Sequence, residues 1–155
     1  MSQDITAEPA LSAPVRKVDQ LLAHYGSSHT HSTNELIHFV AIPLIMLSLY
    51  GLIFVCHPWA AYAFVTASMV YYARLSLVFF FSMCVWSALI MASVQAMGSH
   101  VLLMSAVIFV VAWIMQFVGH KIECKKPSFL EDLQYLWVGP LFVLSKLFAK
   151  LGIRW

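Results

Sequence analysis

The chain has 155 residues, of which 61% are hydrophobic and only 10% are charged, and its formal net charge is +2. A soluble domain carries about 25% charged residues. The composition therefore excludes an ordinary water-soluble protein, and the long apolar runs predict a membrane protein. The few basic residues are scattered and form no stripe with aromatic residues, so we expect no nucleic-acid partner.

The first part of the chain is polar and precedes the apolar runs. We expect residues 1–20 to form a flexible arm, with a short amphipathic helix around residues 15–22. No apolar core lies near the start, so we expect no cleavable signal peptide. The segment 24–31 contains one glycine and two serines and is expected to be a loop. We treat residues 21–155 as a single membrane-embedded domain.

The first membrane helix is expected to begin near Ser32. The motif Ser32-Thr33-Asn34-Glu35 is typical of a capping box, with Ser32 as the N-cap residue and Glu35 three positions later. Pro43 lies inside the apolar run that follows. A membrane helix tolerates proline at such a position, and we expect a kink there.

Four apolar runs are candidates for membrane spans, and a fifth segment is amphipathic. Short turns at 57–58, at Arg74 and at 98–100 separate the runs, and the second run is short for a span. In the fifth segment, which Gly139 and Pro140 are expected to split, basic residues alternate with apolar ones, as is typical of an interfacial helix. The runs and the amphipathic segment cover residues 36–56, 59–73, 75–97, 101–118 and 129–155. The sequence therefore predicts an all-α polytopic membrane bundle of about four transmembrane helices plus a C-terminal amphipathic helix.

The basic residues are distributed asymmetrically across this arrangement. With four spans, the turns at 57–58 and 98–100 lie on one side of the membrane, and neither contains Lys or Arg. The positive-inside rule makes the other side cytoplasmic, in the inner membrane of a bacterium or the endoplasmic reticulum of a eukaryote. All nine basic residues fall on that side: Arg16, Lys17, Arg74, Lys121, Lys125, Lys126, Lys146, Lys150 and Arg154.

Two polar clusters lie at the predicted cytoplasmic ends of the first and fourth runs. In the first cluster, Asn34 and His38 are four residues apart and share a helix face, and His29 lies in the loop before them. In the second, four side chains at intervals of three or four residues fall on one stripe of a helix. They are Trp113, Gln116, His120 and Glu123. Gly119, beside His120, allows another helix or a ligand to approach closely.

Converging imidazoles at this depth predict a metal site, because ionisable groups in a membrane are costly and are functional candidates. We expect His29, His38 and His120 to be metal ligands, with His24 and His31 as additional candidates. Imidazole ligands suit Fe, Zn, Ni or Cu. Histidines 57 and 100 lie at the other ends of the runs and cannot join the site.

Other side chains of the two clusters are candidates for supporting roles. Tyr25, Asn34 and Gln116 are suited to fix the orientation of the imidazole rings, and Trp113 belongs to the same stripe. Glu123 is a further candidate ligand, and it could equally pair with a lysine three residues later, Lys126.

At these two clusters the chain resembles the Mpo1-like family, small membrane proteins similar to a yeast 2-hydroxy fatty acid dioxygenase. Both motifs occur in order and are separated by spans, and the resemblance covers roughly residues 20–148. The matching residues are Tyr25, His29, Asn34, His38 and Pro43, then Trp113, Gln116, Gly119, His120, Glu123 and Pro127.

The resemblance implies Fe2+-dependent oxidation of a 2-hydroxy long-chain fatty acid by O2, with cleavage of the C1–C2 bond to give a fatty acid one carbon shorter. The acyl chain would lie among the spans, while carboxylate and hydroxyl reach the metal and leave a position for O2. Glu123 and Tyr25 are then the candidates for catalytic proton transfer. Lysines near the site could steer the substrate carboxylate, namely Lys121, Lys125 and Lys126.

Three other classes of function use some of the same features. A non-catalytic haem protein would use His38 and His120 as axial ligands. A membrane zinc hydrolase would combine histidine ligands with a glutamate base. A transporter or channel ranks below both, because its polar residues should line a path across the bilayer, whereas these residues cluster on one side.

Overall fold

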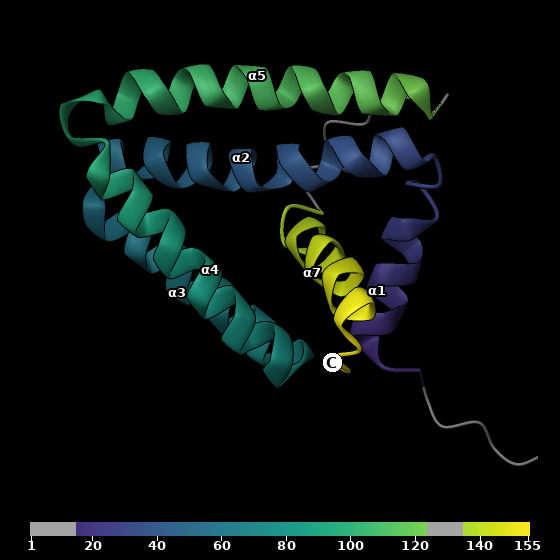
Figure 1. Ribbon diagram of the computed structural model, residues 1–155. Helices are drawn as coiled ribbons and strands as arrows, with labels where there is room; N and C mark the ends of the chain where they lie inside the picture. Colours follow the sequence, from purple (N-terminus) through teal and green to yellow (C-terminus); the bar gives the residue numbers. More distant parts are fainter. Residues whose placement is uncertain (1–14, 124–134) are drawn as a thin grey trace, which may run out of the picture.

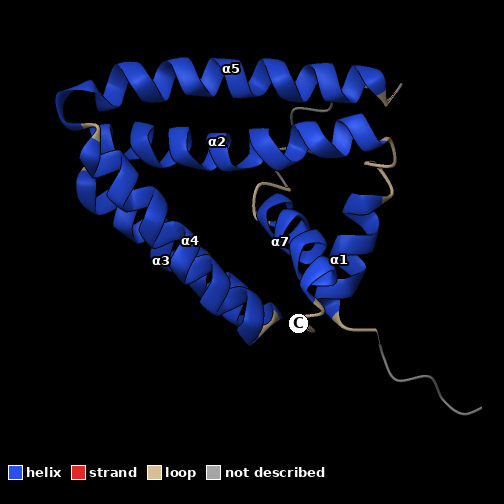
Figure 2. Cartoon of the chain, in the orientation of Figure 1, coloured by secondary structure: helices blue, strands red, loops and turns tan. Residues whose placement is uncertain are grey.

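The computed structural model describes residues 15–123 and 135–155, and in these ranges every regular element is a helix (Figures 1 and 2). The elements are α1 (Lys17–Gly26), α2 (Ser32–Cys56), α3 (Pro58–Leu75), α4 (Leu77–Ala96), the short 3-10 helix η1 (Gly98–His100), α5 (Val101–Ile122) and α7 (Val138–Leu151). The predicted all-α architecture is confirmed. Residues 17–22 of the expected N-terminal amphipathic helix lie within α1, which continues to Gly26.

Three of the described helical segments are long and apolar enough to cross a membrane: Ser32–Cys56, Leu77–Ala96 and Gly98–Ile122. They correspond to the first, third and fourth expected spans. The second expected span is the 18-residue helix α3, whose three tyrosines and Arg74 make it more polar than the others. It pairs with α4, and the two cross obliquely below α2 (Figure 1).

The long helices α2 and α5 lie side by side and antiparallel (Figure 1). Small or polar buried residues recur every seven positions on both: Asn34, Ala41 and Ser48 on α2, and Ser105, Ala112 and Gly119 on α5. A seven-residue repeat keeps one seam facing the partner helix, and small residues let two backbones approach closely. A Cβ atom added to Gly119 would lie 2.2 Å from Asn34 Oδ1, so the expected close approach of another helix at this glycine is confirmed.

The beginning of α2 differs from the predicted capping box. The N-cap residue is His31, whose extended backbone precedes the helix and whose Nδ1 atom accepts a hydrogen bond from the Thr33 amide at 3.2 Å. Ser32 is therefore already helical, and the expectation that it caps the helix is wrong by one residue. The Glu35 carboxylate instead forms an ion pair with Lys146 of α7 at 3.1 Å. The expected loop is also shorter, because α1 includes His24 and Tyr25.

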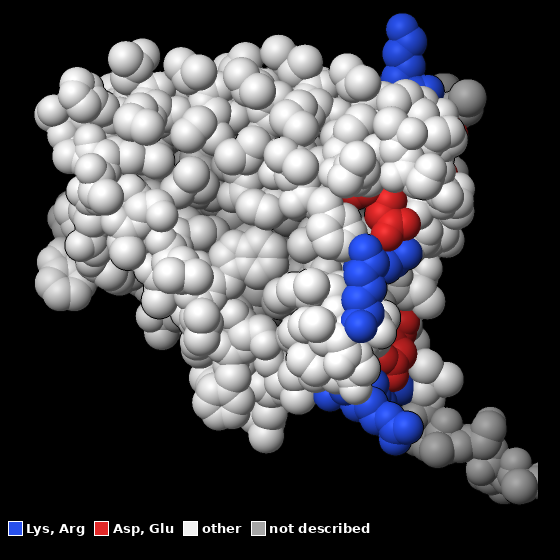
Figure 3. All heavy atoms as spheres, in the orientation of Figure 1, with Lys and Arg blue, Asp and Glu red and all other residues white. Residues whose placement is uncertain are grey.

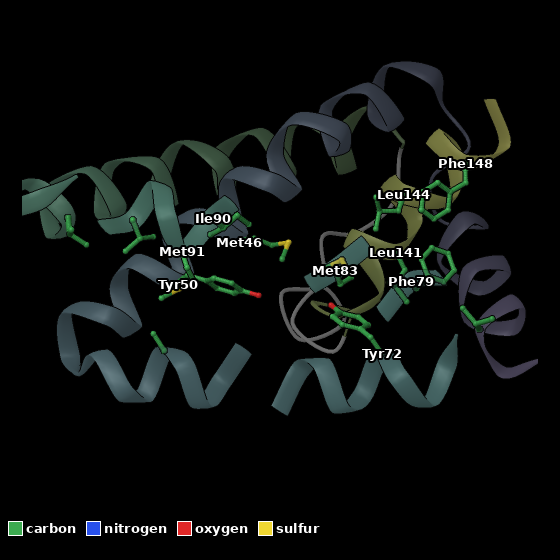
Figure 4. Packing of buried hydrophobic residues seen from close by; sticks show 14 residues of the cluster. Met46, Tyr50, Tyr72, Phe79, Met83, Ile90, Met91, Leu141, Leu144 and Phe148 are labelled. Carbon is green, nitrogen blue, oxygen red and sulfur yellow. The ribbon is translucent and has the colours of Figure 1, made fainter. Parts of the chain in front are cut away.

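The C-terminal helix α7 packs against α1 and α2 (Figure 1). Gly139 and Pro140 do not interrupt it but lie in its first turn, where proline costs no hydrogen bond because the first amides of a helix have no partner within the helix. Leu141, Leu144 and Phe148 enter a core with side chains from the other helices (Figure 4). Labelled members from α2, α3 and α4 are Met46, Tyr50, Tyr72, Phe79, Met83, Ile90 and Met91. This packing holds α7 beneath the N-terminal half of α2.

The charged side chains in view gather along one edge of the molecule, whereas the rest of that face is uncharged (Figure 3). The edge lies over the end that contains α1, α7, the start of α2 and the end of α5 (Figures 1 and 3). The two polar clusters of the sequence are at this same end.

Candidate metal centre

Three imidazoles converge at the charged end of the bundle. His29 comes from the loop between α1 and α2, His38 from α2, and His120 from the last turn of α5. One ring nitrogen from each lies within 4.8 Å of the other two. All three side chains are buried, with exposed fractions of 4%, 0% and 6%. The close contact of α2 with α5 therefore brings together three residues that lie up to 91 positions apart (120 minus 29).

Backbone carbonyls fix the orientation of two of these rings. His29 Nδ1 lies 2.7 Å from the Tyr25 carbonyl oxygen, and His38 Nδ1 lies 2.9 Å from the Asn34 carbonyl oxygen. A carbonyl only accepts hydrogen bonds, so each Nδ1 atom carries the proton and each Nε2 atom presents a lone pair. The two Nε2 atoms face each other at 2.9 Å. Two facing lone pairs are stabilised by a cation between them, either a shared proton or a metal ion.

Tyr25 forms one wall of the centre. Its ring stacks on the His29 ring at a centroid distance of 4.2 Å with an interplanar angle of 13°. On its other sides it contacts Phe142 at 5.1 Å and Tyr135 at 5.6 Å. Helix α7 thus positions Tyr25, and Tyr25 positions His29 through both its ring and its carbonyl group.

Glu123 does not join the imidazoles but ties the end of α5 to the loop that carries His29. Its carboxylate accepts hydrogen bonds from the Thr30 amide at 2.7 Å, the His31 amide at 3.0 Å and the Asn34 side-chain amide at 3.0 Å, and from the Thr30 hydroxyl. The carboxylate lies at the N-terminal end of α2, where the helix dipole favours negative charge. Burial alone would raise the pKa of Glu123, but the hydrogen bonds from Thr30, Asn34 and His31 outweigh it and lower this pKa to about 2.

Replacement of Glu123 by glutamine should loosen this connection. We expect a loss of roughly 1 kcal/mol of folding free energy, because the neutral amide is a weaker acceptor at a helix N-terminus. Folding lowers the pKa of Glu123 from 4.5 to about 2, so its charge stabilises the folded state above about pH 4.5 and this contribution is lost as the pH falls toward 2. Thermal unfolding of the wild type and Glu123→Gln in detergent, across pH 2–7, measures the difference. A melting difference that persists unchanged at pH 2 would contradict this assignment.

Gln116 and Trp113 lie one and two turns before His120 on α5. Gln116 is buried, and its Oε1 atom has no hydrogen-bond partner among the described residues. Trp113 is half-buried between Phe109 and Phe117. Both line a cavity of about 40 Å3, together with Tyr25, Met46 and Pro140. This inner cavity places a polar acceptor and apolar walls beside the centre.

The remaining candidates from the sequence lie outside this group. His24 is exposed and contacts the Tyr135 ring at 5.7 Å, and His31 is exposed and caps α2. Lys121 is exposed at the same end of the molecule, whereas Lys125, Lys126 and Pro127 lie outside the described residues. His57 and His100 are exposed at the opposite end of the α2–α5 pair. His57 is about 28 Å along α2 from His38 at the usual rise of the helix.

Three residues of the site are absent from the prediction. Thr30 holds Glu123, and Tyr135 and Phe142 hold the Tyr25 ring. Thr30 gives little signal in the sequence, because a threonine in a polar loop is ordinary. For Phe142, the aromatic residues of the amphipathic segment indicated that the segment packs against an apolar surface. The sequence did not indicate which surface this is.

These features define a helical protein with membrane-length helices and a buried centre of three histidines at one end. The model of the family described as "2-hydroxy-palmitic acid dioxygenase Mpo1-like" matches residues 15–151. The chain therefore belongs to the Mpo1-like family, and the resemblance seen in its two motifs is confirmed. No curated protein and no solved structure matches the chain.

Proposed function

We propose that the protein is an Fe2+-dependent dioxygenase that cleaves the C1–C2 bond of 2-hydroxy long-chain fatty acids. One 2-hydroxy acid and one O2 would give a fatty acid one carbon shorter, one CO2 and one water. The observation that carries the proposal is the convergence of three buried imidazoles, one of which stacks on Tyr25 in the wall of a largely apolar cavity. Membership of the family supports the choice of substrate and reaction.

The donor set fits a transition-metal ion. His29 and His38 each direct a lone pair toward the same point, and His120 lies beside them at ring-centroid distances of 5.6 and 5.4 Å. Three imidazoles suit Fe, Zn, Ni or Cu, and the dioxygenase description of the family favours iron. Iron held there would supply the redox chemistry with O2 that protein side chains lack.

The protein's own residues would bind and orient the substrate. The buried Gln116 Oε1 atom, which lines the inner cavity, would accept a hydrogen bond from the substrate hydroxyl. Lys121 lies at the same end and would attract the carboxylate, with Lys125 and Lys126 as further candidates. Tyr25 remains the candidate for proton transfer. Glu123 would act as a positioning residue, because N–H groups already occupy both of its oxygens.

The structure gives reasons to prefer this function over the two main alternatives. A zinc hydrolase needs a basic glutamate, whereas hydrogen bonds lower the pKa of Glu123 to about 2. A haem would have to lie between His38 and His120, whose ring centroids are only 5.4 Å apart. A single ion fits this space and a porphyrin does not.

The activity can be tested with purified protein reconstituted with iron without oxygen and then exposed to air. We expect mass spectrometry to detect pentadecanoic acid from 2-hydroxypalmitate and no product from palmitate. Palmitate lacks the hydroxyl-bearing carbon that the reaction oxidises. Equal oxygen uptake with the two acids would rule the proposed reaction out.

We also propose that the centre faces the cytoplasm, because the basic residues that the structure describes lie at the same end of the bundle. A cysteine introduced at Ser99, in the turn at the opposite end, should then react with an impermeant thiol reagent added outside intact cells or to the lumenal side of microsomes. Labelling only after permeabilisation would contradict this orientation.

A further inference from the structure

A series of cavities leads from Tyr25, which stacks on the His29 ring, to the surface of α3. The inner cavity, beside Tyr25 and Gln116, is also lined by Met46 and Leu136. The same two residues line the next cavity, of only about 10 Å3, together with Tyr50 and Phe64. The inner and middle cavities are therefore neighbours that meet at Met46 and Leu136.

The middle cavity adjoins an outer groove on the side of α3. Phe64, Ser68 and Trp137 line both spaces, and Ala67 and Tyr71 complete the groove. Its volume is about 370 Å3, within the range of sites that hold small molecules. The groove is mostly apolar, and it is the wide end of the series.

The wall of the outer groove is held in place by hydrogen bonds. Trp137 Nε1 donates to Ser68 Oγ at 2.9 Å, and the Tyr72 hydroxyl donates to the Trp137 carbonyl oxygen at 3.2 Å. These bonds satisfy the polar atoms of Trp137, so its ring presents an apolar surface to the groove. The Phe64 ring packs against it at a centroid distance of 5.9 Å.

The narrowest point contains a side chain that can move. Met46 is buried, but methionine is unbranched and has three rotatable side-chain bonds, so it adapts to irregular spaces at low cost. A rotation of this side chain would widen the passage between the inner and middle cavities, and the middle cavity adjoins the outer groove. An unbranched alkyl chain is the kind of ligand that passes such a constriction.

A second apolar groove lies between α2, α4 and α7, and neither Tyr25 nor Gln116 lines it. It is larger, about 450 Å3, and its lining includes Pro43, Leu47, Val85 and Leu89. None of its lining residues borders the inner cavity. Size alone would favour this groove, whereas the inner cavity of the series along α3 is lined by Tyr25, whose ring stacks on that of His29.

We propose that the series of cavities along α3 holds the acyl chain of the substrate, with the carboxyl end at the imidazoles and the methyl end in the outer groove. This assignment rests on the proposed function for the identity of the carboxyl end. In this assignment the acyl chain passes between Met46 and Leu136. The residues of the outer groove, Ala67, Tyr71 and Trp137, then limit the length of the acyl chain that fits.

Matched substitutions in the two grooves test the assignment. Ala67 and Val85 are both exposed, so Ala67→Trp and Val85→Trp should fold, and each fills one groove. We expect Ala67→Trp to lower kcat/KM for 2-hydroxypalmitate by about tenfold or more, with 2-hydroxyhexanoate unaffected because its short chain ends before the groove. Val85→Trp should leave both substrates unchanged. A loss with Val85→Trp instead, or an unchanged ratio of the two substrates with Ala67→Trp, would overturn the assignment.

Photolabelling gives a test that does not depend on turnover. The probe is 2-hydroxypalmitic acid with a diazirine at its methyl end, bound to the full chain in nanodiscs, with the labelled peptide identified by mass spectrometry. Label on residues 64–71 or on Trp137 supports the assignment, and label on residues 82–93 overturns it. Labelling at α3 without oxidation of any 2-hydroxy acid would support the acyl site and contradict the proposed function, so the two failures are distinguishable.

Discussion

Replacing any one of His29, His38 and His120 by alanine should remove most of the iron bound after anaerobic reconstitution. The three rings are the only group of this kind in the part of the chain that the structure describes, so one loss leaves two donors and an open site in a buried, poorly solvated place. Because loss of even an outer partner of a ligand costs about 10- to 100-fold in affinity, loss of a ligand should cost at least about 100-fold. Iron is measured by mass spectrometry of the metal, and circular dichroism checks that each variant is folded.

Other histidines of the chain provide the controls for this experiment. His100→Ala and His57→Ala change exposed residues at the opposite end of the bundle and should retain the wild-type iron content. His31→Ala removes an N-cap and should cost on the order of 1 kcal/mol of stability with little effect on iron. If His100→Ala lost as much metal as His38→Ala, the assignment of the metal centre to one end of the molecule would be wrong.

His38 and His120 could be predicted from the sequence because each lies on a helix face with another polar residue nearby in the chain. Asn34 and His38 share a face at four residues, and Gln116 and His120 do so as well, so regular helix geometry decides which side chains point the same way. The basic residues then placed both clusters at one end of the spans. The structure adds that α2 and α5 contact each other, which the small residues at seven-residue intervals on both helices would also have indicated.

The role of Glu123 could not be predicted in this way. Its partners, Thr30 and the amide of His31, lie in a loop about 90 residues earlier in the chain, and no periodic pattern relates a loop amide to a side chain at the end of a distant helix. The error at Ser32 has a similar cause. Serine and a histidine side chain can both accept from the first amides of a helix, and the backbone conformation at His31 decides between them.

The fold of the C-terminal segment also depends on contacts that a single sequence does not show. Amphipathicity predicted an interfacial helix in this segment, but the same pattern also suits a helix that packs against a protein core. Leu141 and Phe148 are buried in the core of the bundle, and Phe142 contacts Tyr25. Helix α7 therefore contributes side chains both to the core of the bundle and to the candidate site.

Gly119→Ala should disturb the candidate metal centre although none of its three histidines is changed. The new Cβ atom would lie 2.2 Å from Asn34 Oδ1 and 3.3 Å from Asn34 Cγ, so the Asn34 side chain or the whole helix must move. Asn34 holds His38 through its carbonyl group and Glu123 through its amide, so its displacement alters both connections. We expect about a tenfold or larger loss of iron affinity, and a loss of about 1–3 kcal/mol of stability from overpacking.

The same substitution at Gly26 is the matched control. A Cβ atom added there would meet only Phe142 Cε2, at an ordinary contact distance of 3.5 Å, although Gly26 is adjacent to Tyr25 of the same site. Gly26→Ala should therefore keep the iron affinity and the melting temperature of the wild type, since the position is helical and alanine favours helix over glycine. Iron titration and thermal unfolding of the two variants separate a local clash from a general effect of added bulk. Wild-type iron affinity in Gly119→Ala would show that the contact of α5 with Asn34 does not position the imidazoles.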